Sequence, residues 1–319
     1  MKMKTAGRTE KKGERKMERK RSARTAMLDV IQALAPAVVA SVLLFGPRAL
    51  LILAASVTAC VLGEYLCRRA MRRENTVGDL SAAVTGTLLA LSLPVTIHPL
   101  IAAVGGVFAV AAVKQPFGGL GKNPVNPALA AHILLLLLFP AAMTAWVEPR
   151  YYLDPSHITA AATPLELLRQ GSAAGRLPNL TSLLLGNTAG CLGTCAAALL
   201  LGGIYLAVRR VIAPVIPLCC FGAVAALSFA MGRSVPVDLL SGGLPLGAVF
   251  MATDPATAPR TAGGRAVFGA GCGIAAMLIR RFVGPAGAVA CAVVLMNLLA
   301  PLIDRAARRP APGKESAGG

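Results

Sequence analysis

The sequence predicts an all-α, polytopic membrane protein with about ten transmembrane helices. Of the 319 residues, 55% are hydrophobic and only 14% are charged, and the mean hydropathy is +0.66. Apolar stretches of about 17–21 residues recur along the chain, and a helix of that length crosses roughly 30 Å of hydrocarbon. A soluble globular domain does not contain ten such stretches, so the composition excludes that class.

Each predicted span is an apolar segment bounded by charged residues or by Gly and Pro. Several spans are short and rich in Gly and Pro, which suits helices packed against one another better than helices surrounded by lipid. The ten predicted spans are 27–45, 49–66, 79–94, 98–113, 128–146, 192–208, 211–231, 236–252, 266–279 and 285–303.

The two ends of the chain and one long loop are expected to lie outside the membrane. Residues 1–25 contain eleven Lys and Arg and three Glu, have no apolar core, and are expected to form a disordered basic tail. Residues 26–305 are then the membrane domain, residues 147–191 its longest loop, and residues 306–319 a short C-terminal tail.

The charge of the protein, a net +18, is interpreted as a signal of membrane topology and not of nucleic-acid binding. Aromatic residues make up only 4% of the chain and offer few platforms for base stacking. If the N-terminus is cytoplasmic, 25 of the 32 Lys and Arg residues fall in cytoplasmic segments and 7 in external ones. The positive-inside rule therefore predicts that both termini are cytoplasmic and that residues 147–191 are external. The pair Arg280–Arg281, on the external side, is the one local exception.

A short internal similarity predicts that the spans form two inverted repeats of five helices. The third span begins Gly78-Asp79-Leu80-Ser81, and the eighth begins Val237-Asp238-Leu239-Leu240-Ser241. These are the third helices of two five-helix halves, and the predicted orientation makes them cross the membrane in opposite directions. Inverted repeats of this kind place their binding site near the interface between the halves.

The eight cysteines and three histidines do not form a metal-binding pattern. No Cys-x-x-Cys occurs, and seven of the cysteines lie in spans or at their ends, where a thiol behaves as a small apolar side chain. Cys191 and Cys195 stand four residues apart, so a disulfide or a metal site there is the alternative, although helical spacing rarely permits disulfide geometry. His132 is expected to be an interior polar residue, and no metal site is predicted.

Polar side chains inside or beside the spans are candidates for function, because burying them in hydrocarbon is costly unless they are paired or face a cavity. The candidates are Asp79, Asp238, Asp254, Glu64, Asn297 and His132. Asp79 and Asp238 begin helices, so capping of free backbone N–H groups is the alternative role for both. Glu64 lies one turn before Arg68, and the alternative for it is an ion pair with that arginine.

Two loops on the predicted cytoplasmic side are further candidates. Residues 114–128 contain three Gly and three Pro within 15 residues and cannot form a regular helix. Their glycines leave backbone N–H groups free for an anion or a flat ligand, and Asn123 and Asn126 can donate and accept hydrogen bonds. Neither a Walker loop nor a dinucleotide fingerprint is present. The second loop, residues 250–261, follows the eighth span, and the pair predicts a shared site or partner surface, with plain connectors as the alternative.

These stretches resemble one family of membrane redox proteins. It comprises the D-type subunit of the Rnf ion-translocating ferredoxin:NAD oxidoreductase complex and the B-type subunit of the Na⁺-translocating NADH:quinone oxidoreductase. The similarity runs from about residue 25 to residue 305, and FGGLG followed by NPxNPA and then FMATDP is a specific combination. The matching stretches, in the order of the family, are Lys114–Ala128, Leu185–Asn187, Leu240–Pro255, Leu295–Asn297 and Ile303–Arg305.

The resemblance implies an integral subunit of an ion-pumping redox complex in the bacterial cytoplasmic (inner) membrane. Such a subunit carries electrons by way of flavin and couples ferredoxin and NAD chemistry to Na⁺ or H⁺ transport. The implied partners are the other subunits of the Rnf-type complex and a flavin transferase, besides the lipid bilayer. The implied fold is similar to the inverted five-helix repeat of urea and ammonium channels. No catalytic side chain is implied for this chain.

The resemblance also implies FMN esterified through its phosphate to a threonine in the external loop, within the motif Asp-x-x-Ser/Thr-Gly-Ala-Thr. Thr163 matches the acceptor, whereas His157, Ala160 and Ala161 stand where the motif has Asp, Ser/Thr and Gly. Three states remain open: FMN esterified at Thr163, noncovalent flavin in the same pocket, and a flavin-free site. Thr163 as the N-cap of a short helix over residues 164–169 is compatible with all three. A second flavin, riboflavin, within the membrane is a further cofactor that the resemblance implies.

Two other functions remain open at the level of sequence. Fold does not determine function, so a stand-alone channel or solute carrier of the same fold is one alternative. A flavin-free structural membrane anchor for partner subunits is the other. If the chain is a redox subunit, ions are expected to move along the interface of the repeats, which Asp79, Asp238, Asp254, Asn123 and Asn126 are expected to line.

Overall fold

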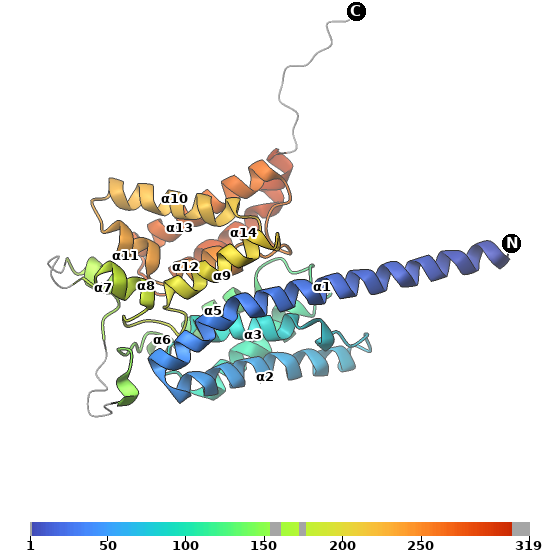
Figure 1. Cartoon of the computed structure of the whole chain (residues 1–319), viewed down its shortest axis with the longest axis horizontal. Helices are drawn as coiled ribbons and strands as arrows, with labels where there is room; N and C mark the ends of the chain where they lie inside the picture. The colour runs from blue at the N-terminus through green and yellow to red at the C-terminus, as the bar shows by residue number, and fades with distance from the viewer. Residues whose placement is uncertain (1, 154–160, 172–176, 308–319) are drawn as a thin grey trace, which may run out of the picture.

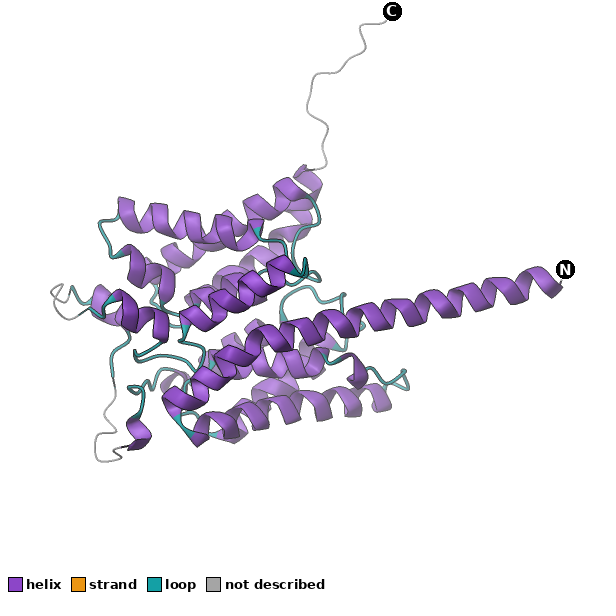
Figure 2. Cartoon of the chain, viewed as in Figure 1, coloured by secondary structure: helices purple, strands orange, loops and turns teal. Residues whose placement is uncertain are grey.

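The structure is a computed structural model of the chain, and it describes residues 2–153, 161–171 and 177–307. In Figure 1 the described helices lie side by side as one bundle, and the N-terminal helix projects beyond it. Every regular element in these residues is a helix, as Figure 2 shows. The all-α prediction is therefore confirmed for the described part of the chain.

The first half of the bundle is built from five apolar segments. The second half also has five, and its third segment is broken between α11 and α12. The first half contains α1 (Lys2–Phe45), α2 (Pro47–Ala70), the short η1 (Val77–Asp79), α3 (Ser81–Ser92), α4 (Pro99–Phe108) with its π-helical continuation η2 (Ala109–Lys114), and α5 (Pro127–Leu138). The second half contains α9 (Ala196–Val208), α10 (Val215–Ala230), α11 (Val235–Leu240), α12 (Leu244–Leu246) with the π-helical η6 (Gly247–Met251), α13 (Ala262–Phe282) and α14 (Ala288–Ala307). Between the halves lie α6 (Pro140–Met143), η3 (Tyr151–Leu153), α7 (Pro164–Arg169) and α8 (Leu180–Leu185).

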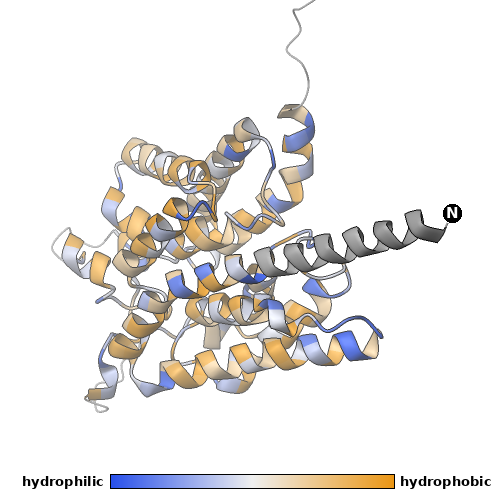
Figure 3. Cartoon of the chain, turned by 45° about the vertical axis from the view of Figure 1, so that its right-hand side comes forward, coloured by the Kyte–Doolittle hydropathy of each residue, from blue (hydrophilic) through white to orange (hydrophobic). Residues whose placement is uncertain are grey.

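Four of the described helices are long enough and apolar enough to cross a membrane. They are Ala23–Phe45, Pro47–Ala70, Ala262–Phe282 and Ala288–Ala307. Five further apolar segments are helices of 10–17 residues. Hydrophobic residues run along the helices of the bundle (Figure 3). Helical structure thus occurs in every predicted span, while the count of ten membrane crossings stays a prediction.

The predicted span 236–252 is not one continuous helix. Gly242 and Gly243 have φ angles of +63° and +70°, in the left-handed region that ends an α-helix. The chain therefore stops α11 at Leu240 and restarts at Leu244. This break brings the loop Ser241–Gly243 to the wall of a cavity described below.

The basic N-terminal segment, expected to be a disordered tail, is helical in the structure. It forms the first part of α1, which begins at Lys2 and continues without interruption into the apolar part of the helix. Lys, Arg, Glu, Met and Ala are good helix formers. Because the apolar part already provides a nucleus, extending it by further turns costs little.

Glycines allow the helices of each half to pack closely. A Cβ atom at Gly86 of α3 would lie 2.6 Å from the Cα atom of Val57 in α2. A Cβ atom at Gly273 of α13 would lie 2.5 Å from the carbonyl oxygen of Cys220 in α10. Both distances are too short for a side chain, so these two helix pairs depend on glycine, as is common where helices associate in membranes.

Candidate functional site

Two cavities within the bundle are lined by four of the predicted site residues, Thr163, Asn123, Asn126 and Asp254, and we call them the inner and outer cavities after the predicted orientation. The inner cavity has a volume of about 500 Å³ and lies beside the loops at residues 114–128 and 250–261. The outer cavity has a volume of about 100 Å³ and is lined in part by residues of α7. In Figure 1, α7 and α8 lie at the opposite end of the bundle from the N-terminus.

The two loops that were predicted to share a site meet at the inner cavity. Lys114, Asn123 and Asn126 line it from the first loop, and Asp254 lines it from the second. Ser81, the first residue of α3, lines it as well. The structure therefore brings three of the five predicted ion-path or flavin residues together, and places Asp79 next to Ser81.

Asn126 joins three segments at the wall of this cavity. Its side-chain oxygen accepts hydrogen bonds from the backbone N–H groups of Ala128 and Leu129 (3.0 and 3.3 Å), which caps the start of α5. Its side-chain nitrogen donates to the carbonyl of Met251 (3.4 Å), and its backbone N–H donates to the side-chain oxygen of Asn297 (3.2 Å). The two asparagines therefore hold both loops and α14 together.

Asn123 and Asp254 have polar atoms available for a ligand. Asn123 is buried, and its side-chain oxygen has no hydrogen-bond partner within the described residues. Asp254 is half-buried and accepts a hydrogen bond from the backbone N–H of Ala256 (3.0 Å). Burial raises the pKa of Asp254 above its usual value, although that hydrogen bond and the charge of Lys114 oppose the shift. Asp254 is thus a carboxyl group that can hold a proton or a cation at the cavity wall.

A buried ion pair forms the side of the inner cavity next to α2. Lys114 Nζ lies 2.8 Å from Glu64 Oε2, and neither side chain is more than 2% exposed. Lys114 also donates to Ser81 Oγ (2.5 Å), and that hydroxyl donates to Asp79 Oδ1 (2.5 Å). Glu64 accepts a further hydrogen bond from Thr76. We call these five residues the inner charge cluster; they join the ends of α2 and η2 to the start of α3.

The inner charge cluster bears on two alternatives that the sequence left open. Asp79 is the last residue of η1 and accepts a hydrogen bond from the backbone N–H of Ser81, the first residue of α3, although the N-cap of α3 is Leu80. Glu64 pairs with Lys114, and not with Arg68 as the alternative proposed. This pair could not be recognised in the sequence, because Lys114 is 50 residues away on a different helix, where helical spacing carries no information.

The outer cavity lies between the two halves of the chain. Ser92 and His132 line it from the first half, Gly242 and Gly243 from the second, and Thr163 from the loop that is predicted to be external. His132 Nδ1 lies 3.1 Å from Ser92 Oγ, so the histidine is a buried, partnered polar residue as expected. Sequence reasoning missed the role of Ser92 and of the two glycines, although a Gly-Gly pair inside an apolar span is a recognisable signal of a break.

Thr163 is the N-cap of α7 and forms a reciprocal capping box with Glu166, so the predicted capping role is confirmed. The backbone N–H of Glu166 donates to Thr163 Oγ1 (3.3 Å). The Glu166 carboxylate accepts hydrogen bonds from the backbone N–H (3.1 Å) and the hydroxyl (3.2 Å) of Thr163. An ester at Thr163 Oγ1 would remove the hydrogen bond from this hydroxyl to the Glu166 carboxylate. Thr163 itself already lines the outer cavity.

Part of the motif around Thr163 lies outside the described residues. His157 and Ala160 belong to the segment 154–160, which the structure does not describe. Ala161 is described, and its backbone N–H donates to the carbonyl of Trp146 (3.0 Å). Because Trp146 also lines the outer cavity, this hydrogen bond holds the residues that lead to Thr163 against the cavity wall.

A second buried group of charges, the outer charge cluster, consists of Ser228, Arg233, Asp238, Ser241 and Arg280. Arg233 forms two hydrogen bonds of 2.9 Å with the carboxylate of Asp238, and Ser228 donates to the same carboxylate (2.8 Å). Arg280 donates to the backbone carbonyls of Asp238 (2.6 Å) and Ser241 (3.0 Å). The hydrogen bonds with Asp238 raise the pKa of Arg233 above its usual value. The cluster joins the ends of α10 and α13 to α11.

The outer charge cluster corrects the capping role considered for Asp238. This residue lies inside α11, whose N-cap is Ser234, and its carboxylate is paired with Arg233. The cluster also explains why the pair Arg280–Arg281 opposes the charge count. Arg280 is 2% exposed and lies 3.8 Å from the Asp238 carboxylate, so it is a buried structural charge and not a surface charge.

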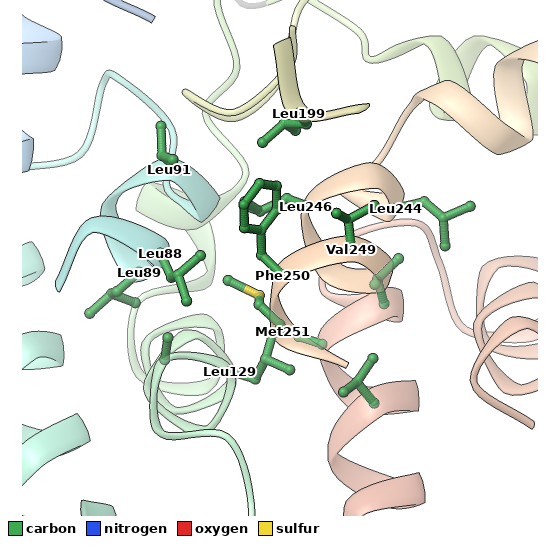
Figure 4. Close-up of a cluster of buried hydrophobic side chains, with 14 of the residues drawn as sticks. Leu88, Leu89, Leu91, Leu129, Leu199, Leu244, Leu246, Val249, Phe250 and Met251 are labelled. Carbon is green, nitrogen blue, oxygen red and sulfur yellow. The ribbon is translucent and has the colours of Figure 1, made fainter. Parts of the chain in front are cut away.

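Apolar side chains separate the two cavities. Phe250 lines the inner cavity, and the next residue, Met251, lines the outer one. Leu88 lines the inner cavity and Leu129 the outer one, and Figure 4 shows all four within one buried cluster. This apolar layer cannot solvate an ion, because transferring a charge into such surroundings is costly without a partner.

Metal-binding chemistry is not assembled in the described part of the chain. No three His, Cys, Asp or Glu side chains there are placed to hold a metal ion. Cys191 and Cys195 are both free thiols. Cys191 lines the outer cavity, and burial raises its pKa to about 11, which keeps the thiol protonated near neutral pH.

Comparison with known proteins identifies relatives over nearly the whole chain. The model of the NQR2, RnfD, RnfE family matches residues 13–313. The D-type subunit of the Na(+)-translocating ferredoxin:NAD(+) oxidoreductase complex of Acetobacterium woodii is 40% identical over 289 residues, which cover 90% of this chain and 89% of that protein. The D-type subunit of the proton-translocating ferredoxin:NAD(+) oxidoreductase complex of Clostridium ljungdahlii is 36% identical, and that of an ion-translocating oxidoreductase complex of Halorhodospira halophila is 38% identical, each covering 88% of both chains. The resemblance seen in the sequence is confirmed, and the chain belongs to the NQR2, RnfD, RnfE family.

Proposed function

We propose that this chain is the D-type membrane subunit of an Rnf-type complex in the bacterial cytoplasmic membrane. In this role it carries electrons by way of flavin between ferredoxin and NAD chemistry and couples them to ion transport. Relatives at 36–40% identity that are named for such complexes support the proposal. The observation that carries it is the pair of cavities at the two predicted sides, one lined by Thr163 and one by Asn123 and Asn126.

The proposal includes ten membrane crossings in two inverted repeats, with both termini cytoplasmic. The two charge clusters support this arrangement. Glu64 and Lys114 join the second and fourth segments of the first half to the start of the third. Arg233 and Arg280 join the corresponding segments of the second half to Asp238 on α11. Matching clusters at corresponding positions are what an inverted repeat predicts.

The inner cavity suits a noncovalent flavin. Its volume of about 500 Å³ falls in the range of roughly 300–1,000 Å³ that is usual for small-molecule sites. Leu88, Phe250 and Pro127 provide apolar surface for a flat ring. The unpartnered side-chain oxygen of Asn123 can accept a hydrogen bond from a ring N–H. Riboflavin fits this combination of an apolar cleft and a few polar groups.

The outer cavity suits the attachment point of FMN better than a whole flavin. At about 100 Å³ it is smaller than typical small-molecule sites. Thr163 is half-buried at its wall and belongs to the external loop that a flavin transferase would reach. We therefore propose FMN esterified at Thr163, with most of the flavin held by the external loop and partner subunits.

In this arrangement the protein separates electron transfer from ion transfer. A bound flavin would supply one-electron chemistry, while the protein sets its distance and surroundings. The apolar layer at Leu88, Leu129, Phe250 and Met251 keeps ions from moving directly between the two cavities. Asp254 is the carboxyl group at the inner cavity that is placed to exchange a proton or a cation. Relatives are named for Na⁺ and for protons, so family membership leaves both ions open.

Covalent flavin at Thr163 is tested by co-expressing the chain with a flavin transferase and looking for fluorescence on a denaturing gel. The wild-type chain is expected to fluoresce and Thr163→Ala to be dark. Thr163→Ser keeps a hydroxyl and the capping contact, so it is expected to retain the label. Thr188→Ala removes another threonine of the same cavity and serves as the matched control.

The alternatives predict different outcomes of the same experiment. A band that persists in Thr163→Ala removes this residue as the acceptor. A dark wild-type band, with flavin recovered from the native protein after denaturation, indicates noncovalent flavin. The absence of flavin from the native complex favours a structural anchor, and ion flux through the isolated chain in vesicles, without redox partners, favours a channel or solute carrier.

A further inference from the structure

A third cavity lies beside the inner cavity and has no role in the proposed function. Its volume is about 260 Å³, and it lies between the α9–α10 connection and the loop that follows η6. Three arginines line it: Arg210, Arg260 and Arg265. Its remaining wall is largely apolar and includes Val211, Ile212, Ala213 and Ile216.

The three arginines are not neutralised by the described part of the protein. None of their guanidinium groups forms an ion pair with the side chains that the structure describes from residue 23 onward. Arg265 Nε donates to the carbonyl of Pro259 (3.1 Å), which orients that side chain. The nearby carboxylate of Asp304 accepts hydrogen bonds from the backbone N–H groups of Arg260 and Thr261 (3.0 and 3.2 Å). Among the side chains that the structure describes (residues 23–153, 161–171 and 177–307), no carboxylate thus forms an ion pair with any of the three guanidinium groups around this cavity.

We propose that this cavity binds the phosphodiester headgroup of an anionic phospholipid. Planar guanidinium groups match the geometry of phosphate oxygens and form the strongest hydrogen bonds with them. Basic pockets between transmembrane helices on the cytoplasmic side are suited to such headgroups. The Lys and Arg distribution places this end of the bundle on the predicted cytoplasmic side.

The surroundings favour a lipid over a soluble phosphate. The helix α10 begins at Val215 and contributes Ile216 to the cavity wall, and it exposes Val215 and Leu218 (40% and 68%). Val267, two residues after Arg265 on α13, is 59% exposed. These apolar side chains continue from the mouth of the cavity along the helices, where the acyl chains of a lipid would lie. The headgroup and its chains therefore both have complementary surfaces.

The third cavity adjoins the inner cavity, so a ligand of the inner cavity would compete with a lipid for it. The residues that line both cavities are Arg210, Val211, Ile212, Thr253 and Pro255. A phosphorylated flavin in the inner cavity could place its phosphate among the arginines. The test must therefore separate lipid from flavin phosphate and from inorganic phosphate.

The proposal is tested by native mass spectrometry of the full-length chain in detergent, titrated with phosphatidylglycerol. Phosphatidylglycerol is expected to bind and phosphatidylcholine to bind far more weakly. Replacing all three arginines by glutamine is expected to lower the affinity on the order of 100-fold, because each basic residue contributes roughly a factor of five. Ala213→Trp keeps the charges but fills the cavity, and it is expected to lower the affinity too.

The matched control removes three basic residues from the same predicted face but outside the cavity, at Arg69, Arg72 and Lys122, all of which are exposed. This control is expected to bind phosphatidylglycerol with nearly wild-type affinity. If both triple variants lose the same affinity for phosphatidylglycerol, the binding depends on general surface charge and not on the cavity, and the proposal is overturned. Displacement of the lipid by inorganic phosphate, or by FMN at similar concentration, would also overturn it, as would equal binding of phosphatidylcholine.

Discussion

Removing the lysine of the inner charge cluster is expected to destabilise the protein strongly. Lys114 and Glu64 are within 2.8 Å of each other, and both side chains are at most 2% exposed. Lys114→Met fills a similar volume but leaves the Glu64 carboxylate buried and without its cation. Breaking a buried ion pair from one side costs about 3–5 kcal/mol, because the remaining charge is unpaired.

The double variant separates pairing from packing. In Lys114→Met with Glu64→Gln, no unpaired charge remains, and the amide can still accept the hydrogen bond of Thr76. The double variant is therefore expected to be more stable than Lys114→Met alone. The coupling between the two positions is expected to be about 1–3 kcal/mol. Glu64→Gln alone is expected to be destabilising as well, since it leaves the ammonium group buried.

The measurement is the free energy of unfolding of the flavin-free chain in mixed micelles, followed by circular dichroism during titration with a denaturing detergent. Lys122→Met, an exposed lysine in the same loop, is the control and is expected to stay within about 0.5 kcal/mol of wild type. A Lys114→Met protein as stable as this control would refute the reasoning. Strict additivity of the two single variants would refute it too, because a direct ion pair cannot be additive.

Three further predictions concern the rest of the bundle. Gly273→Val is expected to destabilise by about 1–3 kcal/mol through overpacking at the α10–α13 contact, whereas Gly222→Val, which meets open space, is expected to be nearly neutral in the same unfolding assay. Arg280→Met removes two charge-assisted hydrogen bonds at the end of α11 and is expected to cost roughly 3 kcal/mol, with the exposed neighbour Arg281→Met as control; equal stability of the two would contradict the buried role. Because burial raises the pKa of Asp254, its contribution to stability is present below the unfolded value of about 3.9 and is lost as the pH rises through the raised folded value. Asp254→Asn should remove that part of the pH dependence of the melting temperature, and an unchanged pH profile would show that this carboxyl group does not titrate as inferred.

Local sequence signals predicted the helices and several of their ends. Asn126 followed by Pro127 predicts a helix start, and the structure has a capped helix there. Thr163 followed by Pro164 is the same signal, and α7 begins at Pro164. Such signals are reliable because a cap acts on N–H groups only two or three residues away.

Side-chain partners between helices could not be predicted in the same way. Glu64 pairs with Lys114 and not with its near neighbour Arg68, because η2 packs so that Lys114 reaches across to α2. The contact of Arg280 with the backbone carbonyl of Asp238 spans 42 residues and could not be predicted from local spacing either. The basic N-terminal segment differs for another reason: its composition indicates disorder, but its attachment to an apolar helix lets the helix continue through it.

The sequence alone determined the class of the protein, because hydropathy and span length are properties of each segment by itself. It also determined the family, since the loop motifs at residues 114–128 and 240–255 are contiguous in the chain. Only the tertiary structure decided which candidate residues share a cavity, which charges neutralise one another, and that an apolar layer separates Thr163 from Asn123. These features depend on contacts between helices far apart in sequence, and in a bundle such contacts are set by packing geometry that no local pattern encodes.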